Sequence, residues 1–247
     1  MTGPEQGRRD ELAAALARVR GRIAAACAAA GRDPAQVRLL PVTKTFPARD
    51  VAQLVDLGLL DAAEARDSEA ATKAAEVASL RPVAAVRWHM VGRLQRNKCR
   101  SVARWAAQVQ SVDSQRLVEA LDRAARSATD AGQRQATLGV LVQASLDGDP
   151  SRGGCPLPEL EALADRVAAA SPQLRLEGVM AVVPLGMDTG VAFAQLGAAA
   201  QRLRRSHPDA VELSAGMSGD LEQAITHGST CVRVGTALLG DRPLTSR

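Results

Sequence analysis

Eight short apolar segments with helical patterns between them constrain the fold of this chain more than any other feature of its sequence. Some are continuous apolar runs, such as 138–142 and 179–183, which is typical of parallel strands covered on both faces. The predicted strands span residues 37–43, 59–63, 86–91, 108–112, 138–145, 175–182, 210–214 and 231–234. Between and after them we predict helices at 47–57, 66–80, 95–106, 114–131, 156–170, 190–206 and 218–227. The alternation predicts one α/β domain over residues 1–247, folded as a (β/α)8 barrel, with an open doubly wound sheet as the alternative.

An additional helix is predicted before the first strand, over residues 9–31. Leu12, Leu16, Val19 and Ile23 recur at spacings of four, three and four, which places them in one apolar stripe. Gly31 follows the last turn, where glycine commonly ends a helix. We expect this helix to pack its stripe against the barrel.

The composition excludes several classes of protein. A net charge of +4, from 31 basic and 27 acidic residues, is too mild and dispersed to indicate nucleic-acid binding, although it is compatible with a phosphorylated small ligand. The four cysteines are scattered without metal-ligand spacing, so we expect free thiols in a reducing compartment and no metal site. No apolar segment is long enough to span a bilayer, and the first residues lack a signal-peptide pattern, which predicts a cytoplasmic protein.

Lys44 is the first candidate for chemistry, because it ends the predicted strand 37–43 and Pro47 then opens the next helix. A lysine in this position is suited to act as an amine nucleophile once it loses its proton, which requires a lowered pKa. The alternative is a solvated lysine at a strand end. Polar residues and glycines also follow the other strands, and in a barrel all these loops open on the same face.

Two glycine-bearing loops near the end of the chain are candidates for binding a phosphate. Residues 214–220 contain Gly216, Ser218 and Gly219 before a helical pattern, and Ser218 is placed to cap that helix. The next strand is followed by Gly235 and Thr236. Loops after the seventh and eighth strands commonly hold phosphate in this fold. An ordinary helix cap with a tight turn would give the same pattern.

His89 stands near the end of the third predicted strand, in the segment Trp88-His89-Met90. Its imidazole would suit a general base, but a lone histidine in a strand is also typical of a hydrogen-bonded residue in the barrel wall. The residues alone leave both roles open.

Five ordered motifs together resemble those of the pyridoxal phosphate homeostasis protein family, which is related to the barrel domain of bacterial alanine racemase. The resemblance covers about residues 10–242. The motifs are Leu39-Leu40-Pro41-Val42-Thr43-Lys44-Thr45, Trp88-His89-Met90-Val91-Gly92-Arg93-Leu94-Gln95-Arg96-Asn97-Lys98, Gly178-Val179-Met180-Ala181, Gly216-Met217-Ser218-Gly219-Asp220 and Gly228-Ser229-Thr230-Cys231-Val232-Arg233-Val234-Gly235-Thr236-Ala237-Leu238-Leu239-Gly240.

The resemblance implies a barrel that carries pyridoxal 5′-phosphate. Lys44 matches the lysine that holds the cofactor as a Schiff base, and Arg233 matches the arginine that faces the pyridine nitrogen. Ser218, Gly235 and Thr236 match the phosphate-binding segments. Met217 and His89, from two of the matching motifs, complete the expected cofactor-binding set, which contains no catalytic residue and no metal ligand.

The family implies a carrier that buffers the cofactor, without robust catalysis of its own. The expected partners are pyridoxal phosphate and apo-enzymes that receive it, and we expect a monomer. Two alternatives remain: an amino-acid racemase or lyase that uses the same Schiff base, or an aldolase in which Lys44 acts directly on a sugar phosphate. One departure concerns Ala65, which stands where the family usually has an asparagine near the cofactor, so we leave it out of the predicted site.

Overall fold

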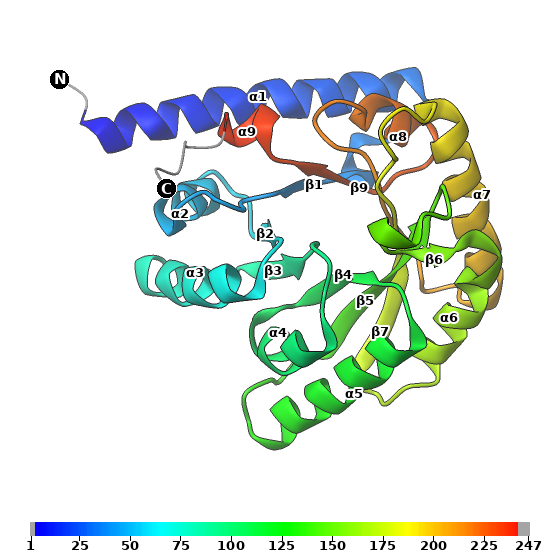
Figure 1. The fold of residues 1–247 in the computed structure, drawn as a ribbon. Helices are drawn as coiled ribbons and strands as arrows, with labels where there is room; N and C mark the ends of the chain where they lie inside the picture. Colours follow the sequence, from blue (N-terminus) through cyan, green and yellow to red (C-terminus); the bar gives the residue numbers. More distant parts are fainter. Residues whose placement is uncertain (1–2, 242–247) are drawn as a thin grey trace.

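The computed structural model describes residues 3–241, and its main sheet is a ring of parallel strands surrounded by helices (Figure 1). Eight strands follow one another in the order β1-β9-β8-β7-β5-β4-β3-β2, and each neighbouring pair is parallel. A bridge between Val42 and Ala63 joins the two ends of this order, β1 and β2. This architecture confirms the predicted (β/α)8 barrel, and the open sheet is wrong.

The elements alternate along the chain as the apolar pattern predicts. The strands are β1 (Arg38–Pro41), β2 (Asp61–Glu64), β3 (Arg87–Met90), β4 (Gln108–Val112), β5 (Leu138–Ser145), β6 (Cys155–Pro156), β7 (Leu174–Met180), β8 (Glu212–Ser214) and β9 (Cys231–Val234). The α-helices are α1 (Pro4–Ala29), α2 (Ala48–Asp56), α3 (Asp67–Leu80), α4 (Cys99–Trp105), α5 (Gln115–Asp130), α6 (Leu160–Ala168), α7 (Thr189–Ser206), α8 (Leu221–Thr226) and α9 (Thr236–Leu239). Short β6 pairs with β5 outside the ring.

Helix α1 lies along one side of the barrel, across α8 and α9 (Figure 1). The predicted stripe is confirmed, because Leu12, Leu16, Val19 and Ile23 are all buried in the core between α1, β9 and α8. Gly31 follows the helix in the left-handed region, with φ 64°, as the terminating glycine was predicted to do. The helix begins earlier than predicted, at Pro4, in a polar turn without an apolar signal.

Three predicted helices are shorter than their patterns. The segment 95–106 is a 3-10 turn (Arg96–Lys98) followed by α4, and 156–170 begins with a 3-10 turn (Leu157–Glu159) before α6. The helix predicted from residue 218 begins at Leu221, because the Asp220 carboxylate accepts a hydrogen bond from the Met217 N–H and holds residues 217–220 as a turn. Pro47 precedes α2 as its N-cap.

The largest apolar core lies between the strands and the outer helices α4 to α7, and it is built mainly from Ala, Val and Leu. No helix within residues 3–241 combines the length and the apolar character needed to cross a membrane. The interior of the strand ring, in contrast, contains many buried polar side chains. One of these buried polar residues, Arg233, also lines the candidate site.

Candidate functional site

A cavity of about 350 Å³ lies at the carboxyl ends of the strands, on the face where barrel loops meet. Six of the seven residues predicted to bind a cofactor line it: Lys44, Met217, Ser218, Arg233, Gly235 and Thr236. They come from the loops after β1 and β8 and from β9 with the loop that follows it. Residues that are nearly two hundred positions apart in the sequence therefore share one cavity.

Lys44 lies in a tight turn directly after β1. The Phe46 N–H donates to the Thr43 carbonyl at 3.1 Å and closes the turn. Thr45 has φ 69°, in the left-handed region that a β-branched residue rarely adopts, and it is the one described residue other than glycine with a positive φ. Such strain costs on the order of 1–3 kcal/mol and persists where the surroundings impose it. The turn therefore presents Lys44 to the cavity at a cost in backbone conformation.

A buried ion pair supports this turn from below. Lys73, on α3, donates through Nζ to Glu64 Oε1 at 2.6 Å and to the Thr43 carbonyl at 2.8 Å. The Thr43 hydroxyl donates to the same Glu64 oxygen at 2.6 Å. Lys73 is thus held by Glu64 and by the backbone one residue before Lys44. Lys44 lines the cavity, and Lys73 does not.

Ser218, Gly235 and Thr236 lie together at the end of the cavity next to α9. The Ser218 hydroxyl accepts a hydrogen bond from the Ala237 N–H at 3.3 Å, which ties the loop after β8 to the loop after β9. The expectation that Ser218 caps α8 is wrong, since that helix begins at Leu221 and has no side-chain cap. Gly216 has φ 90°, and a Cβ there would lie 2.6 Å from the Ala224 Cβ, so the loop requires glycine.

Arg233 is buried inside the ring, with 4% of its surface exposed. Its guanidinium donates to the Ser214 carbonyl and hydroxyl, both at 2.7 Å, and to the Ala181 carbonyl at 2.7 Å. Burial lowers the pKa of Arg233 from its ordinary value. Three hydrogen bonds to neutral oxygens therefore fix a cation at the floor of the cavity.

His89 lies outside this cavity, in the interior of the ring nearer the amino ends of the strands. Its Nδ1 is 2.8 Å from Gln108 Oε1, and its Nε2 is 2.7 Å from Asp61 Oδ1. Both ring nitrogens are therefore used inside the protein, which fits the hydrogen-bonded wall residue that the sequence left open.

A chain of hydrogen bonds nevertheless connects this histidine to Arg233. The Gln110 amide donates to Gln108 Oε1 at 2.8 Å and accepts from the Ser214 hydroxyl at 2.7 Å. Ser214 in turn accepts from Arg233. The polar interior is one connected network.

The sequence did not indicate the apolar wall of the cavity. The wall includes three valines that end or follow strands and look like ordinary core residues in the sequence: Val42, Val91 and Val182. It also includes Phe46, to which the sequence assigned no role. Ala65 also lines the cavity, although it was left out of the predicted site. A Cβ on Gly92 would lie 2.1 Å from the Ala65 carbonyl oxygen, so the loops after β2 and β3 touch here. Only the closed ring brings these positions together.

No group of three or more His, Cys, Asp or Glu side chains within residues 3–241 is arranged to hold a metal ion. The four cysteines are free and buried. Burial raises the pKa of Cys99, Cys155 and Cys231 to about 11, so these thiols are poor nucleophiles at neutral pH.

The chain is similar to known proteins along nearly its whole length. The family model of the alanine racemase N-terminal domain matches residues 15–243. The pyridoxal phosphate homeostasis protein of Mycobacterium leprae is 53% identical over 247 residues, covering 97% of this chain and 96% of the relative. PipY of Synechococcus elongatus, in a crystal structure with pyridoxal phosphate (PLP) bound, is 31% identical with a TM-score of 0.77, covering 93% of this chain and 100% of that one.

Proposed function

The chain belongs to the alanine racemase N-terminal domain family, among the relatives named pyridoxal phosphate homeostasis proteins, and on this basis we propose that it binds and buffers pyridoxal phosphate. The observation that carries the proposal is the convergence of Lys44, Arg233, Ser218, Gly235 and Thr236 on one cavity. A volume of about 350 Å³ is in the range of small-molecule sites, which begins at about 300 Å³.

Lys44 is the residue that we propose to hold the cofactor covalently. When bound, pyridoxal phosphate supplies an aldehyde that condenses with a primary amine and releases one water. The strained turn holds Lys44 at the cavity, and the Glu64–Lys73 pair fixes the carbonyl of the preceding residue. Lys44 lines the cavity and Lys73 does not, which supports Lys44 as the attachment site.

The phosphate of the cofactor is assigned to the end of the cavity formed by Ser218, Gly235 and Thr236. These residues offer two hydroxyl groups and glycine backbone in loops that a hydrogen bond holds together. Hydrogen bonds to a charged group contribute roughly 1.5–3 kcal/mol each. Met217, at the mouth of the cavity, is assigned to the wall beside the cofactor.

Arg233 is assigned to the pyridine nitrogen, and this assignment supports a carrier rather than an enzyme. A permanent positive charge disfavours protonation of a neighbouring ring nitrogen, whereas carbanion stabilisation by this cofactor depends on a partner that protonates it. The sequence also contains no tyrosine that could serve as a second acid or base. Interconversion of alanine enantiomers at about 1 s⁻¹ or faster, a typical enzymatic rate, would contradict the carrier function.

Four further expectations remain part of the proposal. We propose that residues 1–247 act as a single domain, that the protein is a monomer, and that pyridoxal phosphate-dependent apo-enzymes receive the cofactor. We also assign it to the cytoplasm, which the free cysteines support because a reducing compartment preserves thiols.

The decisive experiment is reduction of the protein with borohydride after incubation with pyridoxal phosphate, followed by peptide mass spectrometry. The proposal predicts a yellow protein whose colour is discharged and an adduct on the peptide that contains Lys44. An adduct on Lys73 or Lys98, or no adduct at all, would refute the assignment.

A further inference from the structure

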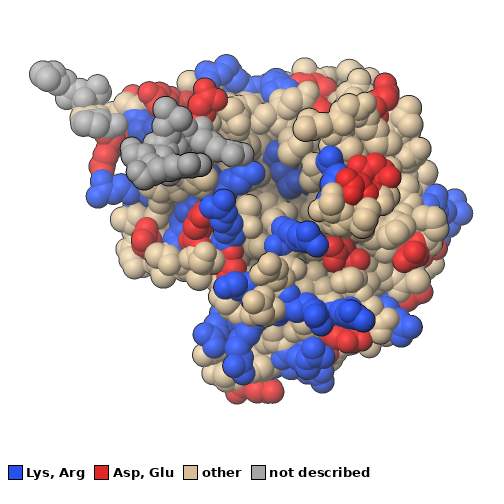
Figure 2. All heavy atoms as spheres, in the orientation of Figure 1, with Lys and Arg blue, Asp and Glu red and all other residues tan. Residues whose placement is uncertain are grey.

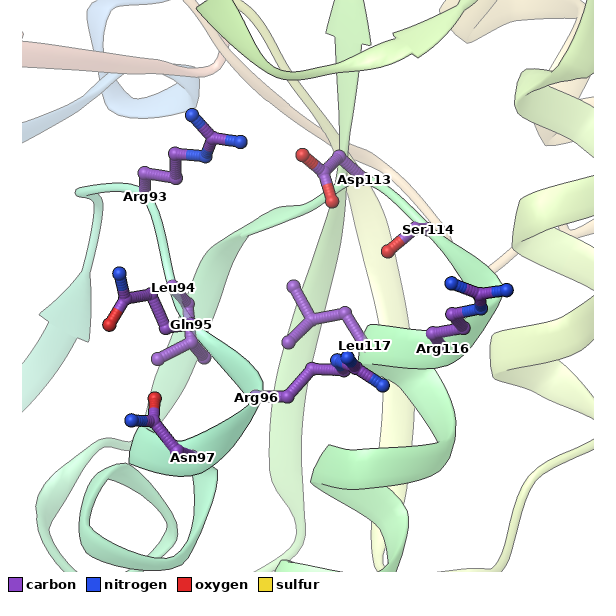
Figure 3. A pocket seen from close by; sticks show the side chains of 9 residues that line it. All are labelled: Arg93, Leu94, Gln95, Arg96, Asn97, Asp113, Ser114, Arg116 and Leu117. Carbon is purple, nitrogen blue, oxygen red and sulfur yellow. The ribbon is translucent and has the colours of Figure 1, made fainter.

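A second, larger hollow lies on the same face of the barrel, between the start of α5 and the segment that joins β3 to α4 (Figure 3). Its volume is about 720 Å³, twice that of the cavity at Lys44. Arg93 and Arg96 come from the β3–α4 segment and Arg116 from the first turn of α5, with Leu117 between them in the view of Figure 3. We call this hollow the arginine groove.

The three arginines of the groove are exposed, and within residues 3–241 none forms an ion pair or a side-chain hydrogen bond. Some other surface arginines are paired: Arg22 pairs with Glu222, for example, and Arg81 pairs with Asp56. Within the groove the single acidic residue is Asp113, which accepts a hydrogen bond from the Gly154 N–H at 3.3 Å. The groove therefore carries an excess of uncompensated positive charge.

The arginine groove and the cavity at Lys44 both border a third hollow. An intermediate hollow of about 360 Å³ shares Val91 and Val182 with that cavity and Arg93 with the groove. Arg93 follows Gly92, which lines the cavity, by one residue. In the space-filling view, Lys and Arg side chains gather around the central depression and on the part of the surface over α4 and α5 (Figure 2). Arg93 and Arg152 line the intermediate hollow together with one acidic residue, Asp147, which pairs with Arg152. Arginines therefore border the surface between the two sites.

We propose that the arginine groove collects phosphomonoester dianions and delivers pyridoxal phosphate to Lys44. This inference rests on the proposed function. Guanidinium groups match phosphate oxygens in geometry and charge. A cleft lined by charge of one sign raises the association rate of an oppositely charged ligand, by roughly tenfold or more where the field is strong. The exposed arginines do not have to bind the ligand tightly for this effect, because they increase the rate at which ligand and protein meet. The final complex at Lys44 is unchanged.

The test measures the rate at which the apo-protein captures pyridoxal phosphate, by stopped-flow absorbance at low and high salt. For the wild type we expect a rate that falls as salt is added, since exposed charges are screened over roughly 10 Å at 0.1 M salt. In the double variant Arg96→Gln/Arg116→Gln we expect a capture rate at low salt that is at least threefold lower, with a shallower salt dependence. The final yield of reducible adduct should remain that of the wild type.

A matched control removes two exposed, unpaired arginines away from the groove, with Arg18→Gln on α1 and Arg205→Gln on α7. Its capture rate should match that of the wild type, because the net charge changes equally but the groove stays intact. Each single variant, Arg96→Gln and Arg116→Gln, is measured as well in case the double variant does not fold.

The inference would be overturned if the wild type and the groove variants captured pyridoxal phosphate at the same rate and with the same salt dependence. It would also be overturned if the control variant were slowed as much as the groove variants. Failure of the wild type to form any adduct would instead refute the proposed function.

Discussion

The two ends of the strand ring use buried polar residues in opposite ways. Near the amino ends, Arg38 donates to Asp61 at 2.9 Å and to Glu212, and the Gln108 amide donates to Glu177 and Glu212 at 2.6 and 2.9 Å. At the carboxyl ends, polar side chains instead surround a cavity. The difference separates two tasks: near the amino ends charged groups pair and hold the ring closed, whereas at the carboxyl ends polar groups line a space that a ligand can enter.

Two local features at the carboxyl ends support this distinction. Thr45 adopts a strained backbone beside Lys44, and the Glu64 Oε2 atom is buried without a hydrogen-bond partner in the described structure. A buried unsatisfied carboxylate oxygen is costly, and such costs concentrate at functional sites. We therefore expect substitutions near the amino ends to change stability and substitutions near the cavity to change ligand binding.

The largest expected effect on the cavity side is the loss of covalent binding in Lys44→Ala. This variant should form no borohydride-reducible adduct, because the amine is gone, while weaker noncovalent binding through the phosphate remains. The variant should remain folded, which denaturant unfolding checks. Lys98→Ala, on the exposed turn before α4, is the control and should form the adduct normally. Adduct formation by Lys44→Ala would remove the distinction between the two ends.

The matching substitution near the amino ends is Asp61→Ala, which leaves Arg38 and His89 without their shared acceptor. We expect the free energy of unfolding to fall by about 3 kcal/mol, since removal of one member of a buried charged network leaves its partners uncompensated. Denaturant unfolding measures this loss, and reducible adduct should still form under native conditions.

Asp56→Ala offers a matched control, because Asp56 also binds one arginine, Arg81, through two hydrogen bonds, but on the surface. Asp56→Ala should lower the free energy of unfolding by about 1 kcal/mol or less. Equal losses of unfolding free energy in Asp56→Ala and Asp61→Ala would mean that the interior network adds no more to stability than a surface ion pair does.

The fold was predictable because strand and helix signals alternate without interruption. Each predicted strand overlaps an observed one, and the stripe on α1 is where its spacing places it. Two short elements, β6 and α9, have no counterpart among the predicted strands and helices. The remaining errors fall at boundaries, where a hydrogen bond of one side chain can decide where a helix begins. Asp220 binding the Met217 N–H is such a case, and no periodicity in the sequence predicts it.

Residues of the predicted site line the observed cavity where they stand in strand-end loops, as Lys44 and Ser218 do. His89, in contrast, does not line the cavity. Its motif suggested a role in cofactor binding, but its position in β3 directs its side chain to Gln108 and Asp61. The apolar wall, including Val182, could not be predicted because its members look like core residues until the ring closes. The polar network through Gln110 also depends on contacts between strands that are distant in sequence.

A smaller effect on the cavity side is expected from Ser218→Ala combined with Thr236→Val. Retention of pyridoxal phosphate during dialysis should weaken at least tenfold, which is about 1.4 kcal/mol, because two hydroxyl donors to the phosphate are lost. Stability of the apo-protein should change little. Thr72→Val with Ser79→Ala removes two hydroxyls that bond to the backbone of α3, and it serves as the control. Unchanged retention would refute the phosphate assignment.

The smallest effect concerns the pH dependence of the two ends. Burial by itself would raise the pKa of Asp61, but the hydrogen bond from His89 and the neighbouring charge of Arg38 outweigh it and lower the pKa below its ordinary value. The unfolded state therefore binds the proton more readily than the folded state. The stabilisation from Asp61 is present above its unfolded pKa of about 3.9 and is lost as the pH falls through the folded pKa.

Asp61→Asn cannot titrate, so it should be less stable than the wild type at pH 7, and the difference should narrow as the pH falls below about 4. The double variant Ser218→Ala/Thr236→Val leaves the network near the amino ends intact. Its free energy of unfolding should therefore differ from that of the wild type by a constant amount across the same pH range. Urea unfolding at a series of pH values measures both differences. A gap between Asp61→Asn and the wild type that stayed constant down to about pH 3 would show that the carboxylate of Asp61 is not stabilised by its partners. In that case the network would be held by packing rather than by charge, and the contrast between the two ends of the ring would lose its electrostatic basis.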